Sequence, residues 1–373
     1  MITMPVNFED VFGTKSGIPV SRTVVTEPGK PMNEDDVELL RILEENRPKI
    51  CIVGTGGSGN NTLNRIQEVG VVGARLVAMN TDAQHLLKTR ADKRMIIGKK
   101  RTKGLGAGSN PEVGEAAAQE SEQEIKDIVG NADLVFVTCG MGGGTGTGSA
   151  AVIARAAKQS GALCIAIVTT PFSSEGLKRK ENAQKGLEKL KREADTTIVI
   201  PNDKLLEYVP DLPLNAAFKA ADMVLANAVK GIAELITKPG LVNLDFADVR
   251  TILGDSGNAM IGLGEMEGSE MPDRVVQAAE KALTSPFLDM DISSATKALI
   301  NITGGADMTL GEAEAAVTAI SRSIAPDAHI IWGATVDDGI KNRGVRVLAV
   351  LSGVREKQVA QTTSEAVENI DFI

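Results

Sequence analysis

From Lys49 onward, short apolar runs alternate with longer segments in which apolar residues recur at helical spacing. The apolar runs are continuous, which predicts strands whose two faces are both buried. Because a helix follows nearly every strand, we expect a parallel sheet covered by helices on both sides. The predicted strands are KICIVG, ARLVAMN, ADLVFVTCG, ALCIAIVTT and TTIVIPN, and the predicted helices cover 59–69, 112–129, 147–159 and 175–194.

A longer helix is predicted over 214–237, where apolar residues return every three or four positions. The pattern changes after residue 248, with strands in AMIGLGE, ATKALINITG, HIIWGATVD and VRVLAVLSG and helices over 273–284 and 310–323. Two domains suit a chain of 373 residues, because single cores stop growing near roughly 250–300 residues. We predict a poorly ordered extension over 1–47 with a short helix near 35–45, an α/β domain over 48–238 that includes the long helix, a smaller α+β domain over 239–353, and a short polar tail over 354–373.

Charge and composition narrow the class of protein. The formal net charge of −9 disfavours nonspecific binding to nucleic acid or to an anionic membrane surface. The chain begins without a basic start and apolar stretch, and no apolar run approaches the ~20 residues of a membrane span. The one dense basic cluster is Lys99, Lys100, Arg101 and Lys103, which is either a solvated loop or a neighbour of a phosphate.

Cysteines and histidines give no sign of a metal site. Cys51, Cys139 and Cys164 each lie in an apolar, strand-like run, so we expect buried thiols in a reducing cytosol. His85 and His329 are far apart in the sequence. A zinc site or a catalytic triad based on histidine therefore has almost no support.

Three glycine-rich loops carry the candidate chemistry. Each is followed by a predicted helix, and two of them directly follow predicted strands, where glycine lets backbone N–H groups approach an anion. Loops that converge at the carboxyl ends of parallel strands make a cradle for a di- or triphosphate. Thr145 and Thr147 add hydroxyl groups, although a tight turn that allows close packing is the alternative. The loops are Gly54 to Asn61, Gly104 to Pro111, and Gly142, Gly143, Gly144, Thr145, Gly146, Thr147 and Gly148.

A dinucleotide site is the obvious competitor, because the first loop contains G-x-G-x-x-G. Such a fold requires Asp or Glu at the end of the second strand to bind the ribose. Here that strand ends in Asn80, with Asp82 two residues further on, so an NAD-dependent oxidoreductase remains a weaker alternative. No segment matches the P-loop pattern G-x-x-x-x-G-K-[ST].

The loops and three further motifs resemble a known family. GGGTGTG resembles the tubulin signature loop, and GTGGSGNN, NTDAQ, GLGAGSNPEVG, PFSSEGLKR and NLDFADVR complete a set similar to FtsZ, the prokaryotic tubulin-like cell-division GTPase. The motifs span about 49–353, and NNTLNRI, KLLEYVPDLPLNAAFKAAD and IIWGATVD are more similar to archaeal than to bacterial members. The resemblance implies a Rossmann-like parallel-sheet GTPase domain of the tubulin/FtsZ type, a long central helix and a smaller α+β domain.

The resemblance also implies roles for individual residues. Gly57, Ser58, Gly59, Asn60 and Asn61 would contact GTP or GDP, together with Asn80 and the Gly142 to Gly148 loop. Ala107, Gly108 and Asn110 would sense the γ-phosphate, and Mg²⁺ would supply countercharge. Glu175 and Arg179 would bind the ribose, Phe218 would stack on guanine, and Asp222 would accept hydrogen bonds from guanine N1–H and N2–H.

Three of these residues also have a plain structural interpretation. Phe218 falls on the apolar stripe of the long helix and could be core. Glu175 and Arg179 are four apart, the spacing of an ordinary solvated pair on a helix. Asp222 lies among Ala, Met and Val, where an unpaired charge is costly, so it needs a partner such as a guanine edge.

The acidic motif NLDFADVR points to an active site shared between molecules. The resemblance makes Asp245 and Asp248, with Asn243, the catalytic residues, whereas a helix cap is the plain alternative. A helix rises 1.5 Å per residue, so Phe218 and Asp245 are on the order of 30 Å apart. Asp248 could then reach only the nucleotide of a neighbouring subunit, which makes head-to-tail filaments and assembly-dependent hydrolysis.

Partners and location follow from the resemblance. A GTPase of this family polymerises into a ring at mid-cell in the cytoplasm, and any attachment to the membrane needs another protein. The last residues, 368–373, could be a docking peptide for a membrane anchor such as SepF or a frayed terminus. A nucleotide-binding filament or scaffold protein without hydrolysis is the alternative function, and the pair Asp245 and Asp248 argues against it.

Overall fold

The computed structural model describes residues 47–208, 214–238, 240–242, 244–267, 273–288, 291–337, 339–340 and 343–354, together with residue 38. These belong almost entirely to one compact unit, Pro48–Ile373. Most of the helix predicted near 35–45, the tail beyond residue 354 and the predicted catalytic residue Asn243 lie outside the described residues. The predicted domain boundaries therefore stay predictions.

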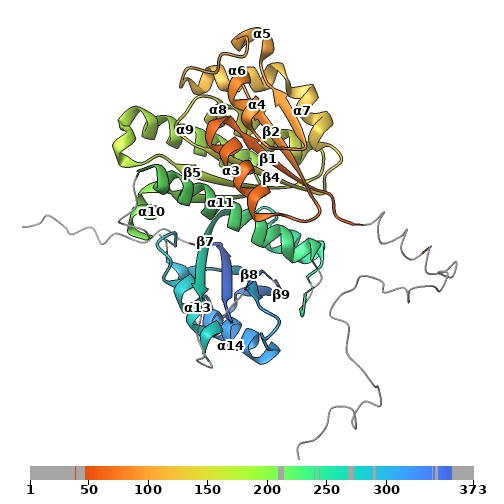
Figure 1. Cartoon of the computed structure of the whole chain (residues 1–373), viewed down its shortest axis with the longest axis vertical. Coiled ribbons are helices and arrows are strands. Elements are labelled where there is room, and N and C mark those ends of the chain that lie inside the picture. The colour runs from red at the N-terminus through yellow and green to blue at the C-terminus, as the bar shows by residue number, and fades with distance from the viewer. Residues whose placement is uncertain are drawn as a thin grey trace, which may run out of the picture. The chain divides into compact units, whose positions relative to one another are not determined.

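The described strands form one ten-stranded sheet in the order β3-β2-β1-β4-β5-β6-β7-β10-β8-β9 (Figure 1). Strands β1 to β6 are parallel, as predicted, and β7 continues the sheet by pairing with β6 from Thr196↔Gly257 to Ile198↔Ala259. β10 is antiparallel to β7 and β8, and β9 is parallel to β8. The bounds are β1 Ile50–Thr55, β2 Ala74–Asn80, β3 Lys93–Ile96, β4 Leu134–Gly140, β5 Leu163–Thr170, β6 Thr196–Pro201, β7 Gly257–Met266, β8 Lys297–Gly304, β9 His329–Val336 and β10 Val345–Ser352.

Helices cover both faces of the parallel part of the sheet, which confirms the expectation from its continuous apolar strands. Along β1, Ile50 and Ile52 pack with α3, α11 and α12, whereas Cys51 and Val53 pack with α7, α8 and α9. The helices are α3 Gly56–Val69, α4 Ala83–Lys88, α5 Lys99–Thr102, α6 Pro111–Glu120, α7 Glu122–Val129, α8 Thr145–Gln159, α9 Leu177–Glu193, α10 Asn202–Tyr208, α11 Leu214–Thr237, α12 Phe246–Leu253, α13 Arg274–Leu283 and α14 Leu310–Ser321, with 3-10 turns η1 Ser173–Glu175 and η2 Ile292–Ser294.

The long helix α11 has the predicted bounds and runs beneath the parallel strands, between them and the β7–β10 part of the sheet (Figure 1). Its stripe Leu225, Ala228, Ile232 and Leu235 is buried. Lys230 Nζ donates to Val69 O at 2.8 Å, which ties α11 to the last turn of α3. Helix α11 is therefore fixed to the helix that begins in the first glycine loop.

One predicted helix is two helices. The segment 112–129 breaks at Ser121, whose φ of −105° and ψ of 15° end α6 before α7 begins. The Ser121 hydroxyl accepts a hydrogen bond from Gly98 N at 3.1 Å, so the break satisfies a buried backbone donor on another segment. Helical periodicity continues across the break, because both halves cover the same face of the sheet.

The predicted helix over 175–194 also starts later than expected. Glu175 ends the 3-10 turn η1, and Gly176 has φ of 94°, a conformation that glycine adopts readily. Helix α9 then begins at Leu177. Glu175 and Arg179 still form an ion pair, but the pair joins a turn to a helix rather than two turns of one helix.

All three cysteines are buried free thiols, as predicted. Burial raises the pKa of Cys51 to about 11 and that of Cys139 to about 12. Burial also raises the pKa of Cys164, with a contribution from the nearby Asp195 carboxylate. The thiolate, which is the reactive form of cysteine, is therefore scarce at all three positions near neutral pH.

Candidate nucleotide site

The three glycine loops converge, as the positions of their strands predict. A Cβ placed on Gly56 would lie 2.7 Å from the backbone N of Gly146, so the loops after β1 and β4 are in contact. A Cβ on Gly144 would lie 2.8 Å from Ala107 Cβ and 2.9 Å from Asn110 N, which brings the third loop against the second. The absence of side chains at Gly56 and Gly144 is what permits this approach.

Two helices begin in this cluster without a side-chain cap. Neither the residue before α3, Thr55, nor the one before α8, Gly144, makes a side-chain cap hydrogen bond. Thr55 Oγ1 instead lies 2.6 Å from Ser149 Oγ. The first N–H groups of a helix have no partner within it, and together with the helix dipole they favour an anion. Two uncapped N-termini in contact therefore make a site suited to phosphate groups.

Other residues of the predicted cradle have structural partners. Asn110 caps α6 by accepting from Glu112 N at 2.9 Å, and Thr147 Oγ1 accepts from Gly142 N at 2.9 Å. A Cβ on Gly148 would lie 2.1 Å from Pro111 O, so this glycine allows α6 and α8 to pack. The packing interpretation thus accounts for Gly148, whereas Gly57, Gly108 and Gly143 face open space, with no atom within 4 Å of an added Cβ.

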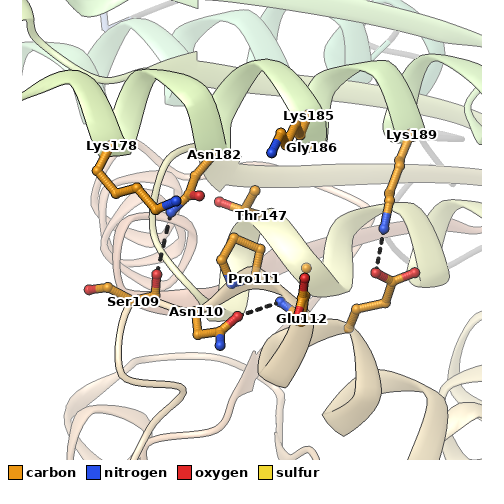
Figure 2. A pocket seen from close by; sticks show the side chains of 12 residues that line it. Ser109, Asn110, Pro111, Glu112, Thr147, Lys178, Asn182, Lys185, Gly186 and Lys189 are labelled. Carbon is orange, nitrogen blue, oxygen red and sulfur yellow. Dashed lines mark hydrogen bonds and ion pairs between the residues drawn. The ribbon is translucent and has the colours of Figure 1, made fainter.

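A groove of about 380 Å³ opens beside the phosphate loops, between α9 and the first turns of α6 and α8 (Figure 2). Asn182 Nδ2 lies 3.4 Å from Ser109 O and 3.5 Å from Gly142 O. Lys189 Nζ lies 2.6 Å from Glu115 Oε2 further along the same groove. Helix α9 is therefore linked to two of the three glycine loops, Gly104 to Pro111 and Gly142 to Gly148.

Among the described residues, three buried asparagines have a polar atom without a partner; Asn301 lies on β8, and the other two follow strands of the parallel part of the sheet. Asn60 is fully buried on α3, and neither its Oδ1 nor its Nδ2 is hydrogen-bonded. Asn202, at the carboxyl end of β6, is 6% exposed and its Oδ1 has no partner. Buried polar groups without partners are rare and call for a ligand or water. The sequence predicted Asn60 and missed Asn202, whose signal was a polar residue directly after a buried strand.

Phe218 differs from the rest of the apolar stripe of α11. Its side chain is 40% exposed, and its ring meets Phe172 edge-on, with centroids 5.1 Å apart and planes at 87°. Phe172 itself is buried and donates its N–H to Glu175 Oε1 at 2.9 Å. Phe218 is therefore not plain core, and its free face is open to a planar group. The predicted ribose contacts, Glu175 and Arg179, adjoin this aromatic pair.

Asp222 lies one turn after Phe218 and has too few hydrogen bonds for a carboxylate. Thr62 Oγ1 lies 3.3 Å from Asp222 Oδ1 and 3.1 Å from Ser58 O, so its single proton serves one acceptor at a time. Burial raises the pKa of Asp222 to about 7, against smaller opposing effects from Thr62 and Arg65. An incoming pair of N–H donors would restore the charged form.

We expect Asp222→Asn to stabilise the ligand-free protein at high pH. Because the folded-state pKa of about 7 is above the ordinary value of 3.8, the stability of the wild type falls as pH rises from about 4 to 7. The variant escapes this loss, so above pH 7 it should gain on the order of 1–3 kcal/mol in the free energy of unfolding. Thermal melts at pH 5 and pH 8, with the surface variant Asp327→Asn as control, would reject the idea if the gain did not depend on pH.

The predicted catalytic acids form a helix cap at the start of α12. Asp248 N donates to Asp245 Oδ1 at 2.8 Å, and Asp245 N lies 3.4 Å from Asp248 Oδ2. Asp245 is exposed and Asp248 half-buried. Further along α12, Arg250 Nη2 lies 3.3 Å from Gly161 O and 3.5 Å from Asp133 O, just before β5 and β4 begin. The capping interpretation is therefore correct, and the acids lie near the amino ends of β4 and β5, of which β4 leads at its carboxyl end to the Gly142 to Gly148 loop.

Asn80 and Asp82, which would have to bind the ribose in a dinucleotide site, make hydrogen bonds within the turn after β2 instead. Asp82 Oδ1 accepts from Gln84 N at 2.9 Å and His85 N at 3.1 Å, so this carboxylate caps α4. Asn80 is buried, and its Oδ1 lies 3.2 Å from Asp82 N. Both side chains are engaged in the turn after β2, which weakens the oxidoreductase interpretation.

Comparisons with known proteins decide the family. Residues 49–210 match the model of the Tubulin/FtsZ family GTPase domain, and residues 257–355 match that of the FtsZ family C-terminal domain. The chain is 54% identical over 331 residues to cell division protein FtsZ 1 of Archaeoglobus fulgidus, covering 89% of each. The chain belongs to the FtsZ family. It is thus a tubulin-like GTPase-family protein with a GTP-binding domain, related to cell division proteins.

Further relatives agree with this assignment to the FtsZ family. The cell division protein FtsZ of Methanothermobacter thermautotrophicus is 57% identical over 327 residues, covering 88% of this chain and 85% of that protein. An empty FtsZ dimer of M. jannaschii superposes with a TM-score of 0.82 at 50% identity, over 91% of this chain and all of that one. A GTPγS-bound protofilament of CetZ2 from Haloferax volcanii has a TM-score of 0.71 at 23% identity, over 82% and 93% of the two chains, and shares the fold.

The described part of this FtsZ-family chain offers no carboxylate cage for a metal. No group of three or more His, Cys, Asp or Glu side chains there could hold an ion. Mg²⁺ commonly binds through one or two carboxylates together with substrate phosphates. None of the described helices is long and apolar enough to cross a membrane.

Proposed function

We propose that this protein hydrolyses GTP within head-to-tail filaments, at a site completed by the next subunit. The observation that carries the proposal is the separation of its two halves. The glycine loops lie at the carboxyl ends of β1 and β4, whereas α12 is bonded to Asp133 and Gly161, just before β4 and β5 begin. A strand of seven residues spans roughly 23 Å, so Asp248 cannot reach a phosphate in its own cradle.

Stacked subunits would bring the two halves together. An acid loop at one end and a phosphate cradle at the other form a heterologous contact, which repeats without closing and produces a filament. Asp245 and Asp248 would orient a water and accept its proton as its oxygen bonds to the γ-phosphorus. The bond from that phosphorus to the β–γ bridging oxygen breaks, which releases GDP and phosphate. Backbone N–H groups of α3 and α8 would stabilise the charge on the phosphates.

Different residues around the cradle would contact different parts of the nucleotide. The free face of Phe218 would stack on guanine, and Asp222 would accept from N1–H and N2–H. Glu175 and Arg179 would bind the ribose, and the amide groups of Asn60 and Asn202 would gain the partners they lack. Mg²⁺, when bound, would supply countercharge on the phosphates.

Hydrolysis that depends on assembly has a clear kinetic signature. We expect GTP hydrolysis per molecule to be low until the protein reaches a threshold concentration, above which activity and sedimentable polymer increase together. The measurement is phosphate release across protein concentrations, with pelleting in parallel. Constant specific activity without polymer would mean a self-contained hydrolase. Polymer without turnover would favour a nucleotide-binding scaffold instead.

The cellular role would be a cytoplasmic division ring at mid-cell. The relatives named above are cell division proteins, and the filament would need a tether to act at a membrane. We propose that residues 369–373 dock on a membrane-anchoring protein such as SepF. A truncated chain that still localises to the septum would remove this part of the proposal.

A further inference from the structure

A strongly basic surface lies at the edge of the sheet, outside the nucleotide site. Within residues 88–103 there are eight basic residues and one acidic residue, in a chain whose net charge is −9. All eight basic side chains are exposed, and none forms an ion pair within the described residues. We call this surface the edge patch; its basic residues are Lys88, Arg90, Lys93, Arg94, Lys99, Lys100, Arg101 and Lys103.

Protection of the edge strand accounts for only part of the edge patch. Strand β3 is the last of the sheet, and cations on such a strand discourage pairing with other chains, which accounts for Lys93 and Arg94. The other six cations lie outside the strand, on α4, α5 and the turns beside them. The acidic residue, Asp92, has its Oδ2 at 2.7 Å from Leu76 N. Most of the positive charge therefore has no structural use in the described molecule.

Helix α9 is a second segment rich in basic residues, with which the edge patch can be compared. It is also rich in lysine and arginine, but Arg179 pairs with Glu175, and Lys189 pairs with Glu115 at 2.6 Å. Glu181, Glu188 and Glu193 on the same helix dilute the charge further. The edge patch and α9 hold similar numbers of basic residues. They differ in net charge, because acidic residues on and beside α9 balance part of its positive charge.

The rest of the chain argues against a nucleic acid or lipid partner. Because the edge patch carries +7 and the whole chain −9, the remaining residues carry −16, which repels a polyanion at longer range. The segment 49–135 contains no Phe, Tyr or Trp that could stack on a base or anchor at a membrane interface. An acidic protein surface of limited extent fits the edge patch better.

We propose that the edge patch binds the acidic part of a second copy of this chain in a neighbouring filament. Residues 239–354 hold sixteen acidic and eight basic residues, so the complementary charge is present in the same protein. This inference rests on the proposed filament. The cradle and acid loop would occupy the two ends of each subunit, whereas β3 lies on the side and repeats once per subunit. Parallel filaments shifted by about half a subunit would bring the basic half of one beside the acidic half of the other.

The test reverses charge at the edge patch without touching the phosphate loops. We expect the triple variant Lys88→Glu, Arg90→Glu, Lys93→Glu to form single filaments with unchanged GTP hydrolysis per polymer. Bundles, measured by low-speed pelleting and by filament width in electron micrographs, should fall about tenfold, because three attractions become repulsions. The control on α9, Lys191→Glu, Arg192→Glu, lies outside the groove beside the phosphate loops and should still bundle, whereas Lys88→Glu, Arg90→Glu, which changes the net charge equally, should not. Wild-type bundles should separate in high salt before the filaments disassemble.

Other outcomes would overturn the lateral contact. Bundling that survives in the edge-patch variant, or that is lost equally in the α9 control, would show that the edge patch is not the contact. Wild-type filaments that stay single but sediment with anionic phospholipid vesicles, or shift an RNA, through the edge patch would assign this surface to that partner. The absence of any filament in the wild type would instead contradict the proposed function, and high-speed pelleting separates this case from the others.

Discussion

Asp248→Ala should bind GTP and assemble, yet hydrolyse at least about 100-fold more slowly than the wild type, because the water loses its general base. Loss of the bond that the Asp248 carboxylate accepts from Asp245 N at 3.4 Å is a separate effect and should cost at most about 1 kcal/mol of stability, because Asp245 still caps the helix. Asp248→Asn separates the two effects, since its amide oxygen can still accept from Asp245 N–H but carries no charge. Both variants should hydrolyse GTP slowly, and only Asp248→Ala should have a lower melting temperature than the wild type.

Mixed filaments provide the control for this prediction. In a heterologous filament made from equal parts of wild type and Asp248→Ala, about half of the wild-type nucleotides would face an alanine. About half of the variant's own nucleotides would in turn face a wild-type acid, so γ-labelled GTP preloaded on Asp248→Ala should be cleaved at about half the wild-type rate, whereas a self-contained site would leave it uncleaved. Asp291→Ala removes a comparable capping carboxylate at η2 and should leave turnover unchanged. Near-normal GTP turnover by Asp248→Ala would contradict an active site shared between subunits.

Asp222→Asn should exchange guanine for xanthine as the preferred base. The carboxylate would accept from two N–H groups of guanine, and hydrogen bonds to a charged group are worth about 1.5–3 kcal/mol each, so GTP affinity should fall about 100-fold or more. Xanthine has a carbonyl in place of the 2-amino group, and the new amide N–H can donate to it. XTP should therefore bind the variant better than GTP does.

Titration calorimetry with GTP, ATP and XTP would measure this exchange. The wild type adds a second criterion, because its Asp222 pKa of about 7 means that GTP affinity should rise with pH up to about 7 and then level off. The same substitution was expected above to raise stability at high pH, so weaker GTP binding could not be ascribed to unfolding. An unchanged ratio of GTP to ATP affinity would show that Asp222 does not read the base.

Most of the fold was predictable because its elements are long and strongly patterned. The strands are continuous apolar runs, and α11 has an uninterrupted stripe over 24 residues. Short elements were missed for a physical reason: β3 is four residues with the sequence KRMI, and α5 is KKRT, where charge hides any periodicity. The break at Ser121 and the left-handed Gly176 depend on contacts that periodicity does not record.

The site was predictable to the level of loops rather than atoms. Parallel strands place their carboxyl ends along one edge, so glycine loops after β1 and β4 had to meet. Which helix N-termini are uncapped could not be predicted, since Thr55 is a good capping residue by type but bonds to Ser149. Asn202 was missed because a polar residue directly after a buried strand is equally typical of a turn, and only its burial without a partner distinguishes it.

The buried thiols have a practical use in the study of these filaments. All three cysteines of the chain are inaccessible and carry raised pKa values, so a maleimide dye should leave the native protein almost unlabelled. A single cysteine introduced at an exposed position, such as Leu87→Cys, would then be the only reactive one. Fluorophores could be placed one per subunit on an otherwise native background, which suits energy-transfer measurements of subunit exchange and of filament pairing.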